Sequence, residues 1–442
     1  MGEQAGLSSR GTRLSGRPAA AGLAAMALLA AVAVFAGPAR ASDGVAASQP
    51  ADPATSQPDG SAASQPDEAS WPSGLLMERL NAIYAAKPVN DLGIRTWGFI
   101  ESGLTGRLTG GQDPLPGRLF DARRPDDLRL NQLRLTIDRP YDPAKDFDIG
   151  GRVDLLFGGD AKLTHAAGLL DKTGEGDGDA WLDLPQAYAQ AWFKTGADSG
   201  LEVLAGKFVT PLGAEVIDAP GNPLYSHSYL FDFAIPFTHT GVKANYIFNP
   251  QVSAYFAVVE GWDDFQDNNS APSYMAGTAL SSKEQIGGHA RVQDSFNVIT
   301  GPEQTDNDSN NRTVVDNTLT YWWTDKLSEA INADYGAEEK VPGTGQAQWY
   351  GVAHYLTYAV NDYLSPTWRV EGFRDVGGTR TGYDTAWYEN TWGVSVTPWP
   401  KDPILKNLSF RPELRWDFAG QPVFGGDRRN QLTLAFDLIF KF

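Results

Sequence analysis

A two-residue alternation of apolar and polar side chains is the feature that most constrains this chain. Residues 407–418 read NLSFRPELRWDF, with an apolar side chain at every even position and a polar one at every odd position. The runs 132–138, 148–157 and 430–442 follow largely the same pattern. Successive side chains of a β-strand point to opposite faces of the sheet, so the pattern predicts an all-β chain.

Alternation alone would also fit a soluble β-sandwich with one buried face. The polar face here, however, carries full charges in mid-strand at Arg411, Glu413 and Arg415, and the apolar face continues unbroken for roughly 20 Å. A transmembrane barrel needs both features, because one face meets lipid and the other meets an aqueous lumen. We therefore predict a transmembrane antiparallel up-and-down β-barrel.

The end of the chain favours the same fold. Bacterial outer-membrane barrels characteristically finish on an aromatic residue preceded by apolar residues at every second position, and this sequence ends on Phe442. We interpret the last strand as the signal that the outer-membrane assembly machinery reads. The residues that carry this signal are Leu434, Phe436, Leu438, Phe440 and Phe442.

Counting the alternating runs predicts about sixteen strands, an even number as closure requires. The runs 272–281 and 293–300 are the weakest, and losing both would leave fourteen strands. Pro412 lacks an N–H donor within a paired strand and predicts a bulge. The expected strands are 93–104, 128–138, 148–157, 186–194, 201–208, 238–248, 251–261, 272–281, 293–300, 313–324, 327–336, 346–359, 364–374, 386–398, 405–418 and 430–442. The longer loops expected are 158–185, 209–237, 262–271, 301–312 and 419–429.

Three segments are expected before the barrel, which we assign to 93–442. Residues 1–41 combine three Arg within 1–18, a run of 18 uncharged residues at 19–36 and an Ala-x-Ala cleavage site, which predicts a cleaved secretory signal peptide rather than a membrane anchor. Residues 42–70 are rich in Ser, Gln, Pro and Asp and predict a disordered linker. Within 71–92, leucines at helical spacing predict a short amphipathic helix.

Composition excludes several classes of function. The net charge of −18 argues against nucleic acid as a partner, and the absence of Cys excludes disulfides and thiolate metal sites. The five His residues form no metal-binding motif, and Ser226-His227-Ser228 is weak as a nucleophile–base pair because adjacent side chains diverge. We therefore expect no enzyme, no cofactor and no metal. The acidic loops fit solvated segments better than calcium sites.

Two motif-bearing stretches are similar to the OmpL-like β-barrel porin family. Gly206-Lys207-Phe208, His239-Thr240-Gly241-Val242 and Gly261-Trp262-Asp263 follow one another in the order that the family shows, and Asp267-Asn268-Asn269 completes the last motif. The resemblance covers roughly 90–442. It implies an outer-membrane diffusion channel without identifying a substrate, and it marks architecture more than chemistry.

The predicted function is a water-filled outer-membrane channel for small hydrophilic solutes. Its selectivity would come from lumenal charges and from a loop folded inward, for which 209–237 is the best candidate on length and on its Pro and aromatic content. For any one charge, a salt bridge without influence on permeation is the more ordinary role. By strand phase, the charges expected to line the pore are Arg134, Arg152, Asp154, Lys243, Arg369, Glu371, Arg411, Glu413, Arg415 and Asp437.

Two other functions stay open from the sequence. One is a channel with a saturable site for a sugar or oligosaccharide, in which the inward aromatics Tyr188 and Trp192 would provide stacking surfaces. The other is a structural or adhesive barrel without an open pore. The partners expected in all cases are outer-membrane lipid and the assembly machinery, with small solutes for a channel. A homotrimer is the assembly expected by analogy with general porins.

Overall fold

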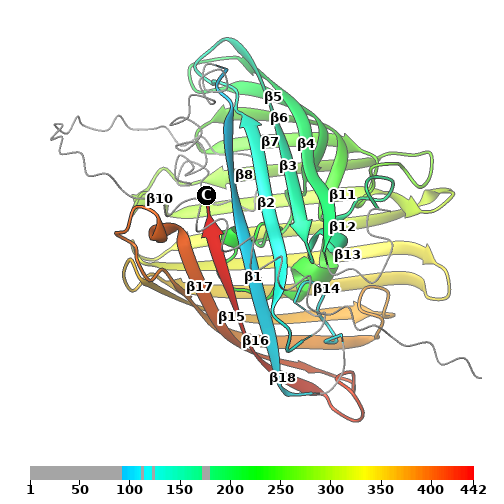
Figure 1. Cartoon of the computed structure of the whole chain (residues 1–442). Helices are drawn as coiled ribbons and strands as arrows, with labels where there is room; N and C mark the ends of the chain where they lie inside the picture. Colours follow the sequence, from blue (N-terminus) through cyan, green and yellow to red (C-terminus); the bar gives the residue numbers. More distant parts are fainter. Residues whose placement is uncertain (1–91, 111–113, 122–124, 172–179) are drawn as a thin grey trace, which may run out of the picture. The chain divides into compact units, whose positions relative to one another are not determined.

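The computed structural model describes residues 92–110, 114–121, 125–171 and 180–442. The predicted signal peptide, the linker and residues 71–91 of the helical segment lie outside these ranges. Within them, none of the helices is long and apolar enough to cross a membrane. The described residues form one closed antiparallel barrel of sixteen strands, with a separate two-stranded hairpin (Figure 1).

The sixteen barrel strands follow one another around the wall in sequence order. They are β1 (Arg95–Thr109), β2 (Arg129–Arg139), β3 (Phe147–Gly158), β4 (Trp181–Lys194), β5 (Gly200–Val209), β6 (Thr238–Asn249), β7 (Val252–Val259), β8 (Ser273–Ser281), β11 (Val292–Gln304), β12 (Asn307–Trp322), β13 (Leu327–Val341), β14 (Gly345–Tyr358), β15 (Leu364–Val376), β16 (Thr385–Val396), β17 (Leu408–Ala419) and β18 (Asn430–Lys441). The short hairpin is β9 (Gln285–Ile286) with β10 (His289–Ala290).

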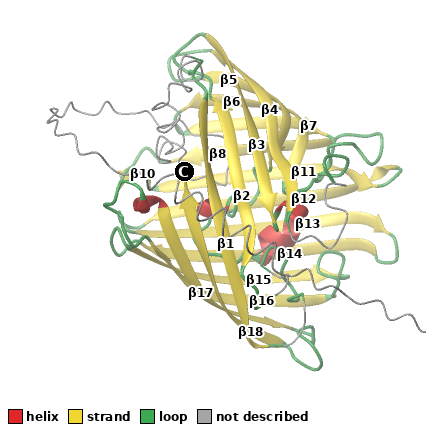
Figure 2. Cartoon of the chain, in the orientation of Figure 1, coloured by secondary structure: helices red, strands yellow, loops and turns green. Residues whose placement is uncertain are grey.

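Helical segments are short and few among the described residues (Figure 2). They are α4 (Ala161–Thr164), the 3-10 turns η2 (Ala219–Gly221) and η4 (Leu405–Asn407), and the π-helical turn η3 (Leu230–Ala234). Two of them, η2 and η3, belong to the long connection between β5 and β6. That connection, residues 210–237, is called the internal loop below.

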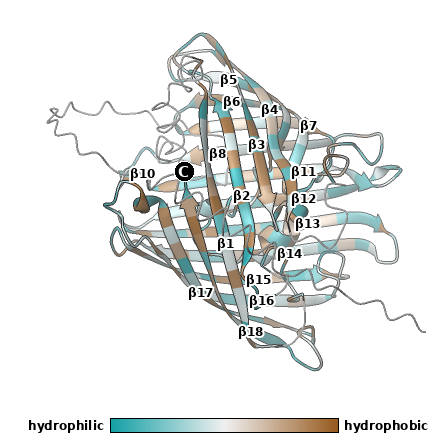
Figure 3. Ribbon diagram, in the orientation of Figure 1, coloured by the Kyte–Doolittle hydropathy of each residue, from teal (hydrophilic) through white to brown (hydrophobic). Residues whose placement is uncertain are grey.

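The alternation of apolar and polar residues decides which side chains of each strand point outward and which point inward. In β17, Trp416 and Phe418 are exposed on the outer surface, while Arg415 and Asp417, which alternate with them, are fully buried inside. Hydrophobic and hydrophilic residues alternate along many of the strands (Figure 3), and many large apolar side chains of the strands are exposed on the outer surface. Because lipid has no hydrogen-bonding groups, a barrel with every strand paired and an apolar exterior satisfies the needs of a bilayer.

The sixteen-strand prediction is confirmed, including the weak runs that become β8 and β11. One predicted loop is wrong: 301–312 is mostly strand, since β11 and β12 extend to a two-residue turn at Thr305 and Asp306. The polar residues there suggested a loop, but a protruding hairpin also keeps them in water. Pro412 causes a gap in the β16–β17 ladder without a change of register, so the expected bulge is absent.

The two ends of the barrel differ in their connections. The end that carries the internal loop is called the loop end, and the opposite one, which holds Arg95 and Phe442, is called the turn end. At the turn end, Gly98 of β1 and Phe442 exchange two backbone hydrogen bonds. The Gly98 N–H donates to the Phe442 carbonyl at 2.9 Å, and the Phe442 N–H donates to the Gly98 carbonyl at 2.8 Å. The last residue therefore takes part in joining β18 to β1.

Candidate functional site in the barrel interior

The internal loop crosses the inside of the barrel. Its start lies against β11, where Asn297 donates to the Pro211 carbonyl at 3.1 Å. Only a few residues later it reaches the far wall, where Gln132 of β2 donates to the Ile217 carbonyl at 2.8 Å. The loop was the preferred candidate for an inward-folded segment, and the structure places it there.

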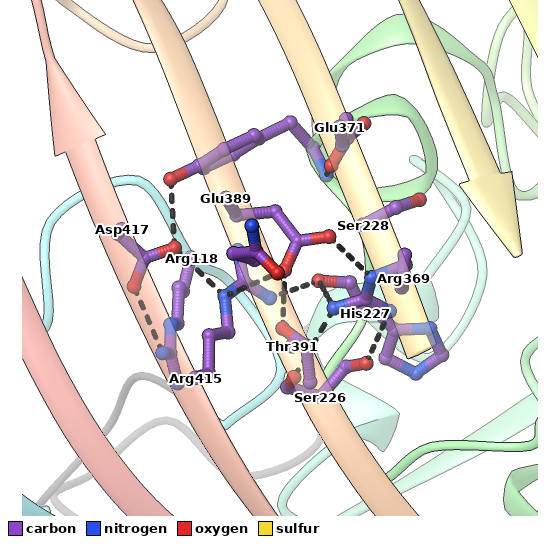
Figure 4. A network of polar contacts seen from close by, with 12 residues as sticks. Arg118, Ser226, His227, Ser228, Arg369, Glu371, Glu389, Thr391, Arg415 and Asp417 are labelled. Atoms are coloured by element: carbon purple, nitrogen blue, oxygen red, sulfur yellow. Dashed lines mark hydrogen bonds and ion pairs between the residues drawn. The ribbon is translucent and has the colours of Figure 1, made fainter. Parts of the chain in front are cut away.

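Arginines from the strands hold the loop by its backbone (Figure 4). Arg369 of β15 donates to the Ser226 carbonyl at 2.7 Å and to the His227 carbonyl at 3.2 Å. Arg415 of β17 donates to the same His227 carbonyl. Charge-assisted bonds of this kind are shorter and stronger than neutral ones, so they fix the loop in one position.

Carboxylates on the strands accept hydrogen bonds from backbone N–H groups of the internal loop. Glu371 accepts from the Tyr229 and Leu230 N–H groups at 2.6 and 2.7 Å. Glu413 accepts from the Tyr225 and Ser226 N–H groups at 3.0 and 3.1 Å. The backbone of a buried loop needs partners for its polar groups, and here the charged strand residues supply them.

Glu215 is the loop's own contribution to this network. Its carboxylate lies 2.6 Å from Arg369 and also accepts from Tyr355 and from the Ser228 N–H. Burial would raise the pKa of Glu215, but the Arg369 charge and the hydrogen bond from His227 lower the pKa to about 2. The carboxylate is therefore ionised at every physiological pH and balances the arginine.

Ion pairs among strand residues continue the network away from the loop, one between β15 and β16 and one within β17. Arg369 also pairs with Glu389 at 2.6 Å, and Arg415 pairs with Asp417 at 2.7 Å. Asp417 accepts the Tyr229 hydroxyl at 2.8 Å, which ties the loop to β17 as well. The interior thus contains a network of ion pairs in which buried charges of opposite sign are neighbours.

A second inward segment was not foreseen. Residues 114–121, between β1 and β2, place Arg118 beside Asp121 and 2.9 Å from Asp417. Burial would lower the pKa of Arg118, but these two carboxylates raise it. Phe120 of the same segment packs on the His227 ring at 4.7 Å. The two segments therefore form one packed body inside the barrel.

Asp232 is the exception to this charge balance. It is buried in η3, and one carboxylate oxygen accepts the Leu119 N–H at 3.0 Å while the other has no hydrogen-bond partner. Burial raises the pKa of Asp232 to about 7. This carboxyl group is therefore partly protonated near neutral pH.

Glycines on the strands make room for the loop. A Cβ atom at Gly103 would lie 2.5 Å from the Tyr225 ring, and one at Gly393 would lie 2.3 Å from Leu224. Both glycines occupy inward-facing positions of β1 and β16. The wall and the loop are thus matched in shape as well as in charge.

The inward phase assigned to the ten predicted charges agrees with where their side chains lie. All except Lys243 are buried, and each of these nine either bonds to the internal loop or pairs with an inward residue of opposite charge. Their role as pore-lining residues stays a prediction. The buried nine are Arg134, Arg152, Asp154, Arg369, Glu371, Arg411, Glu413, Arg415 and Asp437.

Lys243 of β6 stands apart from those nine. It is partly exposed, with its ammonium 5.4 Å from the Phe208 ring and 5.9 Å from the Tyr255 ring. Tyr188 and Gln190 of β4, which lies two strands from β6 in the barrel, are also partly exposed. The strands β4 to β6 form one sector of the barrel wall. This sector lies away from the strands that hold most of the internal loop.

The two aromatics considered for a stacking surface have different environments. Trp192 is only 2% exposed and stacks on Tyr141 with the ring centroids 5.0 Å apart. Its faces are therefore occupied by protein. Tyr188, in contrast, is partly exposed.

Several residues of the site carried no separate signal in the sequence. Glu215, Tyr229 and Asp218, which pairs with Arg134, lie in a loop with no periodicity. Arg118 lies in a connection between strands. Glu389 and Asp417 do follow the inward phase and could have been included on that basis. Within the described residues, no group of three or more His, Asp or Glu is arranged to hold a metal ion.

Comparison with known proteins agrees with this architecture. The model of the family described as Putative beta-barrel porin-2, OmpL-like, matches residues 94–442. The chain belongs to this family. It is therefore an outer-membrane porin, and the resemblance noted in its loop motifs is confirmed. No curated protein matches the sequence.

Solved structures resemble this porin in fold at low identity. The outer-membrane channel DcaP of Acinetobacter baumannii is 14% identical with a TM-score of 0.51, over 79% of this chain and 97% of that one. The anion-selective porin of Comamonas acidovorans is 8% identical with a TM-score of 0.51, over 79% and 99%. Pseudomonas putida OprB is 13% identical with a TM-score of 0.51, over 82% and 97%.

Proposed function

We propose that this porin conducts small hydrophilic solutes through a passage narrowed by the internal loop. The observation that carries the proposal is the position of that loop, which crosses from β11 to β2 and is bound to β15 and β17. The passage runs along the sector of β4 to β6, where partial exposure is kept by the inward side chains of Tyr188, Gln190, Glu202 and Lys243. Lumenal charges and the loop together set its selectivity.

The test is single-channel recording with protein purified from outer membranes. Steady openings in concentrated salt are the expected result. A variant in which a short Gly-Ser linker replaces residues 214–234 should conduct more, because the narrowing segment is gone. Silence from protein that shows the heat-modifiable mobility of a folded barrel would contradict the proposal, as would equal conductance of a folded loop-shortened variant.

A sugar-selective channel is the second candidate, and it rests on Tyr188. Adding maltose-type oligosaccharides should then produce transient blocks of the current, and Tyr188→Ala should abolish them. A wild-type current that is indifferent to sugars would exclude this candidate while leaving the passive channel intact.

The remaining proposals concern processing and assembly. We infer that residues 1–41 are removed during export, which N-terminal sequencing would test by finding Ser42 first. No enzymatic activity is proposed. A homotrimer is proposed by analogy with general porins, and chemical cross-linking in native membranes should yield a three-subunit band. A monomer under all cross-linking conditions would contradict it.

A further inference from the structure

Lys243 is a cation of the inner wall that the interior leaves unbalanced. Within the described residues, no carboxylate oxygen lies within 4.0 Å of its ammonium. The inward arginines differ, since Arg134 and Arg152 share Asp154, and Arg411 pairs with Asp437. Lys207, on the neighbouring strand, lies 3.6 Å from Asp183. Lys243 is also partly exposed, whereas these four cations are buried.

The side chains that flank Lys243 across the strands are apolar or aromatic. Leu204 of β5 and Ala257 of β7 are its direct cross-strand neighbours, and both are buried. The Phe208 and Tyr255 rings lie within cation–π range of the ammonium. Apolar side chains have a low dielectric constant, so the positive charge of Lys243 is screened less than it would be in water. Its electrostatic attraction for anions in the passage therefore extends over a longer distance.

The inward carboxylate to consider is Glu202 on β5. It lies opposite Asn245, one inward position closer to the turn end than Lys243. It is partly exposed and has no ion pair within 4.0 Å among the described residues. Its charge opposes that of Lys243 along the same sector, which makes the two residues a matched pair for an experiment.

We propose that Lys243 is an anion-binding position in the passage and that it takes small monovalent anions, chloride and monocarboxylates among them. The proposal rests on the channel function proposed above. One ammonium offers a single charge and three N–H donors. Sulfate and phosphate carry more charge, so removing their water of hydration costs more free energy. Leu204, Ala257 and Phe208 beside Lys243 provide no donors to offset that cost, so these anions are disfavoured.

The experiment measures the reversal potential across a bilayer under a gradient of KCl. Lys243→Gln should lower the chloride-to-potassium permeability ratio at least twofold, and Lys243→Arg should keep the wild-type ratio. Glu202→Gln should raise the ratio. Lys283→Gln removes the same charge from an exposed turn at the turn end and serves as the control, with no change expected.

A second series replaces chloride with acetate or sulfate. Acetate should carry current in the wild-type channel, and its permeability should fall with Lys243→Gln. Sulfate should be at least several-fold less permeant in both. Open channels whose ion preference is the same in wild type and Lys243→Gln would overturn the inference but leave the channel function standing. A wild-type protein without openings would overturn the channel function itself. Heat-modifiable mobility establishes folding for each variant.

Discussion

Arg369 occupies the centre of the interior network at the scale of single residues. It contacts Glu389 of the adjacent strand, Glu215 of the internal loop and the carbonyls of Ser226 and His227. A buried ion pair contributes little net stability by itself, because desolvation offsets the attraction. Removing one partner is different, since the remaining charges stay buried without compensation.

Arg369→Met should therefore destabilise the barrel by about 3–5 kcal/mol. It should also raise conductance, because the loop loses three of its anchors. Denaturant unfolding in detergent measures the first effect and bilayer recording the second. Arg107→Met is the control: Arg107 pairs with Asp126 at the surface, where an ion pair contributes about 0–1 kcal/mol. Equal effects of the two substitutions would rule out a central role for Arg369.

The raised pKa of Asp232 predicts that the stability of the folded barrel depends on pH. Its pKa is about 7 in the folded state, against 3.8 for an ordinary aspartate, so the folded chain keeps a proton that the unfolded chain releases. Stability from this group is complete below pH 4 and is lost as the pH rises to 7, by up to about 4 kcal/mol.

Asp232→Asn removes that titration. The variant should be more stable than the wild type at pH 8, and the difference should shrink toward pH 4. Unfolding curves at several pH values measure it. Asp427→Asn, in an exposed loop, should change nothing. A stability difference that is the same at pH 4 and pH 8 would show that Asp232 does not titrate in this way.

At the scale of elements, the internal loop is a packed part of the barrel rather than a free connection. Its aromatic side chains join the wall in one apolar cluster, which includes Tyr229, Phe231 and Phe237 from the loop and Trp349 and Phe373 from the strands. The Trp349 indole N–H donates to the Ala234 carbonyl at 3.0 Å. We therefore expect the loop to resist proteases.

Substituting the two glycines beneath the loop tests this fit. Gly103→Val and Gly393→Val should each displace the loop, because the new side chains would overlap Tyr225 and Leu224. Chymotrypsin should then cleave within 210–237, where the wild type is protected. Gly372→Ala is the matched control, since its Cβ would lie 3.4 Å from Tyr388 at an ordinary contact distance. Wild-type resistance in both valine variants would contradict the tight fit.

At the scale of the whole molecule, the last residue takes part in closing the barrel. Phe442 exchanges two backbone hydrogen bonds with Gly98, and a Cβ at Gly98 would lie 2.8 Å from the Phe442 ring. The ring thus covers a glycine on the first strand. The final strand is also the predicted assembly signal, so the two roles meet in one segment.

Deleting Phe442 should reduce the amount of folded barrel in outer membranes several-fold. Heat-modifiable gel mobility of membrane fractions measures the folded amount. Phe418→Leu, which changes an outward aromatic residue away from the chain end, is the control and should assemble normally. Normal assembly of the deletion variant would show that neither closure nor the assembly signal requires this residue.

The sequence by itself determined the wall of this porin. Strand number, inward phase and the lipid-facing residues all follow from a period of two, because a strand repeats its geometry every second residue and each face meets one solvent. The weak runs at 272–281 and 293–300 stayed open in the sequence, because losing both would still leave an even number of strands, and the structure shows both as barrel strands, β8 and β11.

Only the tertiary structure decided which partners the inward side chains of the wall contact. Strand phase places Arg369 and Lys243 equally inward, yet one is buried in the loop network and the other is partly exposed. The difference depends on a loop without periodicity, whose path is set by partners more than a hundred residues away, such as Glu371 for Tyr229. Contacts of that range leave no local pattern, because each depends on how the closed barrel brings distant strands together.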